Sequence, residues 1–193
     1  MTSIGIIHHS GTGYTRILAD AVARGALAQD GAKIERLEVL GSDIREGRYA
    51  NEAVLATLDA CDAIIFGTPT YMGGVSAQMK AFLDATVQRW YARTWSGKLA
   101  AAFTVSSTPS GDKFNALTDV LTCALQHGMI WVGLDESPLS KESVNRLGFY
   151  LGAAAQPDYS ARPAALQAGD AETGARLGAR VARLAVDGSK ARR

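Results

Sequence analysis

The sequence predicts an α/β protein in which a parallel sheet is covered by helices on both faces. Short apolar segments alternate along the chain with longer segments of helical periodicity. The apolar segments are mostly continuous runs, which is typical of parallel strands buried on both faces. A chain of 193 residues fits one domain, and we expect a single domain over residues 1–193.

Five segments read as strands, because they are short and rich in Ile, Val, Ala or Phe. Segment 33–40 alternates between polar and apolar residues, so we expect it to be half exposed or at an edge. The predicted strands are 3–8, 33–40, 62–67, 99–105 and 129–133.

Five segments read as helices, with apolar residues three and four positions apart. Strands and helices therefore alternate, and right-handed connections between parallel strands are expected. The predicted helices are 13–29, 51–60, 76–90, 113–127 and 170–186.

Two segments fall outside this pattern. Residues 134–168 contain Pro138, Pro157 and Pro163 and show little periodicity, which predicts a long irregular loop with a functional or interfacial role. Residues 188–193 read as a basic, solvated tail.

The composition argues against several classes of protein. A net charge of +1 lacks the strong positive excess of a typical nucleic-acid binder. It also lacks the strong negative excess of an acidic electron carrier. No apolar run approaches the length of a membrane helix, so we expect no membrane partner. Cys61 and Cys123 form no CxxC pair and fit no zinc spacing. We therefore expect two free thiols, no metal site and a cytoplasmic location.

The loops after the first, third and fourth strands share a composition of Ser, Thr, Gly and Pro. Ligands of open parallel sheets bind beyond the carboxyl ends of the strands, so these loops predict one composite site. The first loop, Ser10-Gly11-Thr12-Gly13-Tyr14-Thr15, combines hydroxyl donors with a helix N-terminus, which favours an anion held by neutral donors. It matches neither a Walker loop nor GxGxxG. A plain turn with a Ser/Thr helix cap is the alternative.

The pattern [ST]-x-T-G-x-T after a first strand resembles the FMN phosphate loop of flavodoxins. The chain as a whole resembles the WrbA-type branch of that fold, the flavodoxin-like NAD(P)H:quinone oxidoreductases. The resemblance rests on AIIFGTPTYMGGVSAQMKAFLD (63–84), on Trp90 ahead of Gly97-Lys98, and on LTCALQHGMIWVG (121–133). It implies a three-layer sandwich with a five-stranded parallel sheet in the order 2-1-3-4-5.

The resemblance also implies roles for single residues. Residues 10–15 bind the FMN phosphate, and His127 approaches the ring system. Tyr71 or His127 could hydrogen-bond the flavin pyrimidine edge, and Trp90 helps to form the pocket for nicotinamide or quinone. The remaining residues are implied to flank the flavin on its two sides: Pro69, Thr70, Tyr71, Met72 and Gly73 on one, and Ser106, Ser107, Thr108 and Gly111 on the other.

Three of these side chains have plainer interpretations. His127 could simply complement the dipole at a helix C-terminus, and His9 is more typical of a strand end than of a catalyst. The helix that ends at Trp90 runs away from the loops, so Trp90 can reach a flavin only in another subunit. We therefore expect a homo-oligomer, a dimer or tetramer, unless the segment RWYARTW packs locally under the sheet.

The resemblance implies two-electron transfer from NAD(P)H through FMN to a quinone or a similar small acceptor. The alternative is a one-electron, flavodoxin-type carrier that docks on a protein partner, although its near-neutral charge counts against this. A third possibility is a domain that has kept the fold and lost FMN.

Overall fold

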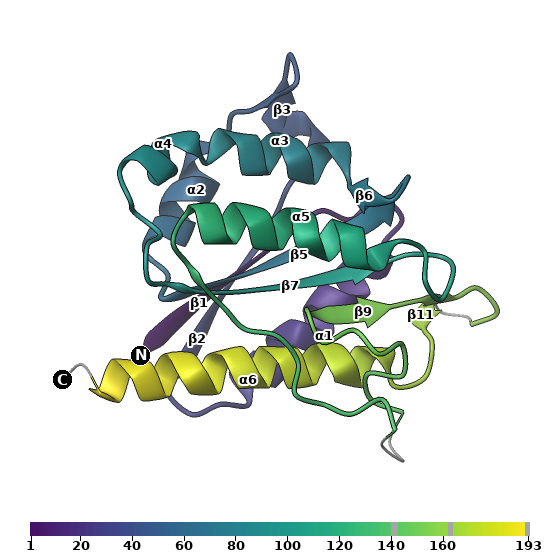
Figure 1. Cartoon of the computed structure of the whole chain (residues 1–193). Helices are drawn as coiled ribbons and strands as arrows, with labels where there is room; N and C mark the ends of the chain where they lie inside the picture. Colours follow the sequence, from purple (N-terminus) through teal and green to yellow (C-terminus); the bar gives the residue numbers. More distant parts are fainter. Residues whose placement is uncertain (140–142, 162–163, 192–193) are drawn as a thin grey trace.

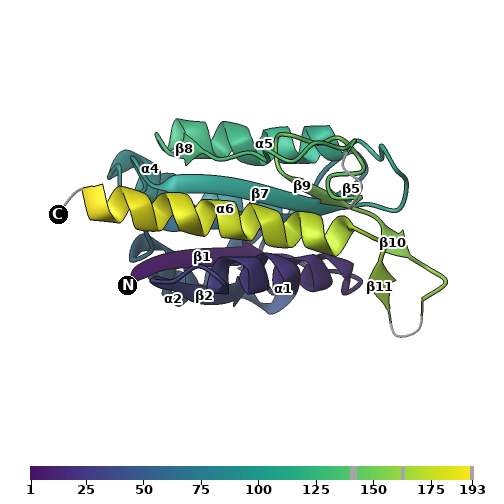
Figure 2. The same ribbon diagram turned by 90° about the horizontal axis from the view of Figure 1, so that it is seen from below.

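The computed structural model of the chain describes residues 1–139, 143–161 and 164–191. A mainly parallel sheet lies between two layers of helices (Figures 1 and 2). Helices α1 (Tyr14–Leu27) and α6 (Asp170–Ala191) cover one face. The other face is covered by α2 (Glu52–Asp59), α3 (Ala77–Ala85), α4 (Val87–Tyr91) and α5 (Lys113–Gln126). The predicted fold class is confirmed.

The parallel strands pair in the order β2-β1-β5-β7-β8. Their bounds are β1 Thr2–His8, β2 Ala32–Glu38, β5 Ala63–Tyr71, β7 Leu99–Val105 and β8 Ile130–Trp131. The remaining short elements are a 3₁₀ turn (Gly41–Asp43), β3 (Ile44–Arg45) paired with β4 (Arg48–Tyr49), β6 (Gly74–Val75) paired with β5, and β10 (Pro157–Asp158) paired with β11 (Ala165–Leu166).

The fifth strand position is shared by two separate segments. β8 pairs with the start of β7, and β9 (Ala153–Ala155) pairs with its end, at residues 103–105. The prediction of an irregular loop over 134–168 is therefore wrong for β9, β10 and β11. Alanine is a poor strand former, but its small side chain fits this position, where all three residues are buried. Gly152, just before β9, is close-packed: a Cβ there would lie 2.2 Å from the Ala102 carbonyl oxygen.

The third predicted strand continues into the segment predicted as a loop. β5 extends through Pro69 to Tyr71 and turns back into β6. Proline is tolerated here because the pairing of β5 with β1 ends at Gly67. The two-residue turn consists of Met72 (φ 46°) and Gly73 (φ 83°), and positive φ at both positions is typical of hairpin turns.

Two predicted helices have different ends. The helix predicted over 76–90 breaks at Thr86, whose hydroxyl donates to the Leu83 carbonyl at 2.7 Å and lies 2.8 Å from His127 Nε2. α6 continues to Ala191, so the predicted basic tail is helical to that point, and residues 192–193 lie outside the described residues, as does Pro163. Within the described ranges, no helix is long and apolar enough to cross a membrane.

Candidate functional site

The three loops predicted to form one site lie at the carboxyl edge of the sheet. We call residues 10–15 loop 1, residues 68–74 loop 2 and residues 106–112 loop 3. Loop 2 is the β5–β6 hairpin, and loop 3 connects β7 to α5 (Figure 1).

Loop 1 presents a run of backbone donors to its surroundings. Gly13, with φ +90°, is the N-cap of α1, and the Ser10 hydroxyl accepts a hydrogen bond from Arg16 N at 3.1 Å. The N–H groups of Gly11 through Thr15 donate to no acceptor in the part of the chain that the structure describes. Successive free N–H groups at a helix N-terminus form an anion-binding concavity. The helix-cap interpretation accounts for Ser10 alone.

The positive charge nearest to loop 1 in the sequence is already paired with a carboxylate. The guanidinium of Arg16, directly after the loop, is ion-paired with Glu38 at 2.7 Å. Loop 1 itself therefore offers only neutral N–H and O–H donors, and the binding of an anion by these donors remains a prediction.

Loop 2 touches loop 1 through a tyrosine. A Cβ added at Gly11 would lie 2.3 Å from the Tyr71 hydroxyl oxygen, so this position has no room for a side chain. Thr70 is buried, with its hydroxyl 2.8 Å from that of Thr104, whereas Met72 at the tip of the hairpin is fully exposed. Tyr71 is thus placed at the boundary between loops 1 and 2.

A buried hydrogen-bond network supports loop 2 from below. His9 Nδ1 lies 2.8 Å from the Ser76 hydroxyl, and Ser76 caps α3 by accepting from Met79 N at 3.2 Å. Ser76 N also donates to the Thr68 hydroxyl at 3.1 Å. Burial lowers the pKa of His9, which favours the neutral ring. His9 thus joins the end of β1 to the start of α3, in line with the strand-end interpretation.

Loop 3 is tightly folded and is linked to loop 2. At Gly111 (φ +49°) a Cβ would lie 2.1 Å from the Ser106 hydroxyl oxygen. Ser107 and Thr108 are exposed on the loop. Asn115, at the start of α5, donates from Nδ2 to the Gly73 carbonyl at 2.8 Å. The structure therefore brings together all the predicted residues of loops 1, 2 and 3, and their assignment to FMN remains a prediction.

Sequence reasoning missed Tyr159, which lies between the paired segments β10 and β11. Its hydroxyl is 2.6 Å from the Ser107 hydroxyl, and its ring meets that of Tyr14 edge-on at 5.8 Å between centroids. Gln156 Nε2 also donates to the Ser107 carbonyl, at 2.9 Å. The C-terminal part of the segment predicted as irregular thus connects loop 1 to loop 3. No local pattern in the sequence marks Tyr159.

The segment that contains Gln156 and Tyr159 is held in place by an ion pair that the sequence did not reveal. Arg146 Nε lies 2.8 Å from Asp170 Oδ1, and Gln156 N donates to Asp170 Oδ2 at 2.7 Å. Asp170 is only 1% exposed. Burial raises the pKa of Asp170, and the hydrogen bond from Arg146 opposes that shift.

His127 and Trp90 lie away from the three loops. Together they line a groove of about 550 Å³ between α3, α4 and α5. His127 follows the C-terminus of α5, at the end of that helix opposite loop 3. α4, which carries Trp90, and β6 lie at opposite ends of α3 (Figure 1). One chain therefore does not bring these two residues to its own loops.

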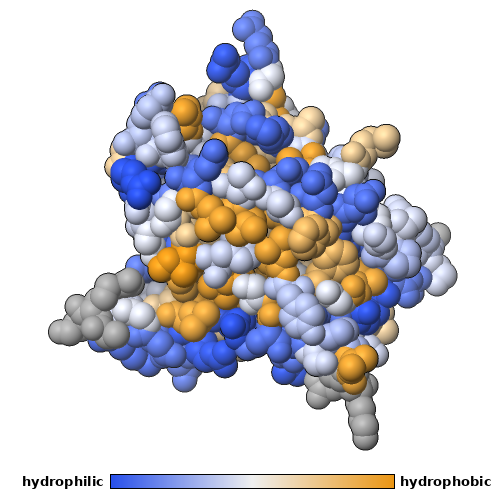
Figure 3. All heavy atoms as spheres, viewed as in Figure 1, coloured by the Kyte–Doolittle hydropathy of each residue, from blue (hydrophilic) through white to orange (hydrophobic). Residues whose placement is uncertain are grey.

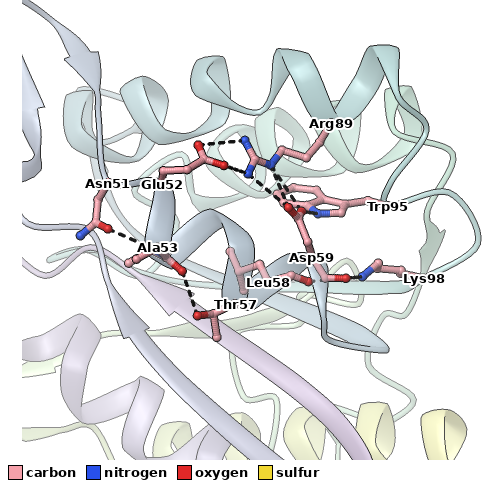
Figure 4. Close-up of polar contacts among 10 residues, drawn as sticks. Asn51, Glu52, Ala53, Thr57, Leu58, Asp59, Arg89, Trp95 and Lys98 are labelled. Atoms are coloured by element: carbon pink, nitrogen blue, oxygen red, sulfur yellow. Dashed lines mark hydrogen bonds and ion pairs between the residues drawn. The ribbon is translucent and has the colours of Figure 1, made fainter.

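A cluster of polar contacts connects α2 with α4 and with Trp95. Arg89 binds Glu52 and Asp59, and Asp59 also accepts from Trp95 Nε1 at 2.7 Å (Figure 4). Trp95 is fully buried, but Trp90 is 42% exposed. The alternative that the segment RWYARTW packs locally under the sheet is thus correct for Trp95 and wrong for Trp90.

Comparison with known proteins shows the family. The profile of the NADPH-dependent FMN reductases matches residues 2–142. The chain belongs to this family. It is 39% identical over 189 residues to flavodoxin FldP of Pseudomonas aeruginosa, covering 95% of this chain and 97% of that protein. It is 40% identical over 168 residues to an NAD(P)H dehydrogenase (quinone) of Archaeoglobus fulgidus, covering 80% of this chain and 85% of the relative.

Solved structures agree with this membership. The crystal structure of a flavodoxin, WrbA-like protein from Agrobacterium tumefaciens matches with a TM-score of 0.73 and 36% identity, over 97% of this chain and 99% of that one. The resemblance to the WrbA-type branch is therefore confirmed.

As a member of the NADPH-dependent FMN reductase family, the protein is an oxidoreductase, with FMN as cofactor and a nicotinamide as donor. The residues present fit FMN. Loop 1 offers N–H donors that have no acceptor among the described residues, and the close approach of Tyr71 to Gly11 places an aromatic ring directly beside them.

Proposed function

We propose that the protein transfers two electrons from NAD(P)H through FMN to a quinone or a similar small acceptor. The observation that carries the proposal is the set of unused N–H donors in loop 1, next to two loops that share its edge of the sheet. The name of the relative from Archaeoglobus fulgidus supports the choice of a quinone. We also propose that the 193 residues act as one domain.

The protein's own part is to bind and orient. Loop 1 binds the phosphate, and loops 2 and 3 flank the flavin ring. FMN, when bound, supplies the two-electron redox chemistry. The buried network of Thr68, His9 and Ser76 keeps the hairpin of loop 2 in place, so that Tyr71 presents its ring and hydroxyl at a fixed position.

We propose further that a second copy of the chain completes the site. Trp90 lies at the edge of the sheet opposite loops 1–3, so it can contact a flavin only in a neighbouring subunit. Apolar side chains gather over α5 and the segment that follows it (Figure 3). Phe114, Leu125 and Ile130 are all exposed there, and exposed apolar patches mark association surfaces. The free thiols of Cys61 and Cys123 suit a reducing cytoplasm, which we propose as the compartment.

The alternative is a one-electron carrier, and the relative called flavodoxin FldP favours it. Carriers of that kind dock on protein partners by charge complementarity. The net charge of +1 provides no strong field for such docking, which favours the small-molecule acceptor.

Two measurements on the FMN-loaded protein test the proposal. Anaerobic mixing with NADH or NADPH in a stopped-flow instrument should bleach the flavin absorbance, and benzoquinone should restore it. A flavin that stays oxidised with both nicotinamides contradicts the reductase. In a stepwise reductive titration, direct conversion to the fully reduced flavin supports the reductase, whereas a well-populated semiquinone supports the carrier.

A further inference from the structure

Lys113 is completely buried, with 0% of its surface exposed, directly after loop 3. Lysine is almost never fully buried unless it is paired. Lys113 is also the first residue of α5, where the positive end of the helix dipole disfavours a cation. A lysine in this position costs stability, so its burial needs another explanation.

The ammonium group of Lys113 makes its contacts within loop 3. Nζ donates to the Thr108 carbonyl at 2.5 Å and to the Pro109 carbonyl at 3.2 Å. The carboxylate of Asp170 attracts it through space, but Asp170 is already ion-paired with Arg146 at 2.8 Å. The positive charge of Lys113 is thus directed at the backbone of the loop.

These contacts fix the direction in which loop 3 presents its polar groups. Two consecutive carbonyls are turned inward, toward Nζ. In a planar trans peptide the N–H points opposite to the C=O. The N–H of Ser110, which shares its peptide unit with the Pro109 carbonyl, therefore points outward, and it has no acceptor among the described residues. Ser107 and Thr108, in the same loop, are exposed.

We propose that Lys113 is a positioning residue whose ammonium group holds loop 3 in the shape that binds FMN, so that the protonation of Lys113 sets FMN affinity. The inference rests on the proposed function, because it requires FMN at loops 1–3. Lys113 is buried and acts through the backbone of residues 108–110.

The protonation of Lys113 changes within an accessible pH range. Burial lowers the pKa of Lys113 to about 8, Asp170 raises it, and Arg146 lowers it further. These two side chains are the charged groups that act on it, from α6 and from the segment before β9. Above about pH 8 the neutral amine makes weaker, uncharged hydrogen bonds. FMN affinity should therefore be constant below that pH and fall above it.

Stability of the FMN-free protein should change in the opposite direction. The folded-state pKa of about 8 lies below the ordinary value of 10.5, so burying the ammonium costs stability below pH 8. That cost disappears as the pH rises from about 8 toward 10.5. A loss of FMN affinity over the same interval therefore cannot come from the effect of Lys113 on folding.

The experiment measures the dissociation constant of FMN from about pH 7 to about pH 9.5 for wild type, Lys113→Met and Lys33→Met. Lys33 is an exposed lysine on β2, paired with Glu35 and remote from the loops, so it is a matched control. Lys113→Met should bind FMN about tenfold more weakly at neutral pH, because it loses a charge-assisted contact to two carbonyls, and its affinity should not vary with pH. Wild type and Lys33→Met should lose several-fold affinity above about pH 8.

The outcomes separate the inference from the proposed function. If Lys113→Met binds FMN as tightly as wild type, or keeps the wild-type pH profile, the inference is wrong and the proposed function stands. If wild type binds no FMN at any pH, both are wrong. If Lys113→Met does not fold, the wild-type and Lys33→Met profiles decide: a loss of affinity above about pH 8 supports the inference and a flat profile overturns it.

Discussion

Two glycines in loop 1 meet different physical requirements. Gly13 has φ +90° and open space around it, so it provides a backbone conformation that other residues rarely adopt. Gly11 provides room, because the Tyr71 hydroxyl occupies the space that a Cβ would need. The backbone conformation of Gly13 concerns the turn alone, whereas the space left by Gly11 couples loop 1 to loop 2.

Gly11→Ala should weaken FMN binding about tenfold, since its methyl group must displace the Tyr71 hydroxyl or deform the loop. Because the steric conflict is with the hydroxyl, Gly11→Ala combined with Tyr71→Phe should recover part of the affinity. Gly41→Ala, at an open and exposed site, is the control. Fluorescence titration with FMN measures all three, and an unchanged affinity in Gly11→Ala would show that the two loops are not coupled in this way.

Tyr159 should slow the departure of FMN, because it connects loop 1 to loop 3. Tyr159→Phe removes the hydroxyl contact with Ser107, and Tyr159→Ala also removes the ring contact with Tyr14. We expect the dissociation rate to rise about threefold in the first variant and about tenfold in the second, as for the loss of one and two modest contacts. Equal rates in all three proteins would remove Tyr159 from the site.

Among single residues, the sequence pointed to those candidates whose proposed role depends on local chemistry. The hydroxyls and glycines of loop 1 could be read from their position after a strand. Lys113 could not, because its burial depends on how loop 3 folds over it. Tyr159 is brought to loops 1 and 3 by a chain segment whose path the sequence pattern does not indicate.

Among the elements, α1 and α6 pack through direct backbone contact. A Cβ at Gly178 would lie 2.0 Å from the Val22 carbonyl oxygen, and one at Gly25 would lie 1.9 Å from the Ala175 carbonyl oxygen. The glycines on both helices let the backbones approach closely, and α1 carries loop 1 at its N-terminus. This packing therefore also fixes the position of loop 1, the proposed phosphate site.

Gly178→Ala should lower the free energy of unfolding by about 3 kcal/mol, because the added methyl group must separate two backbones. Gly188→Ala is a matched control on the same helix, where nothing lies within 4 Å of the added Cβ. It should raise the free energy of unfolding by about 0.5 kcal/mol through helix propensity. Urea denaturation measures both, and equal effects of the two substitutions would contradict the close packing of α1 on α6.

The elements that the sequence predicted well are those with a strong hydrophobic period, such as α5 and β7. β9 was missed because Ala153–Ala155 carry no strand signal, and only pairing with the end of β7 makes them a strand. The break at Thr86 was missed because threonine is compatible with a helix and its contact with His127, 41 residues further along the chain, is not visible in the local sequence.

The whole molecule has two distinct candidate regions: loops 1–3 at one edge of the sheet, and the groove with Trp90 and His127 toward the other. If a neighbouring subunit joins these regions, light scattering should give a dimer or tetramer.

In such an oligomer, Trp90→Ala should slow flavin bleaching by NAD(P)H about tenfold, by removing a stacking surface, without weakening FMN binding. Trp90→Phe should be close to wild type. A monomer, or an unchanged bleaching rate in Trp90→Ala, would confine the site to one chain.

The central claim is that loops 1, 2 and 3 form an FMN site, and titration of FMN fluorescence with the purified protein tests it most directly. The account predicts saturable quenching with one FMN per chain. FMN fluorescence that remains unchanged at an excess of folded protein would contradict it.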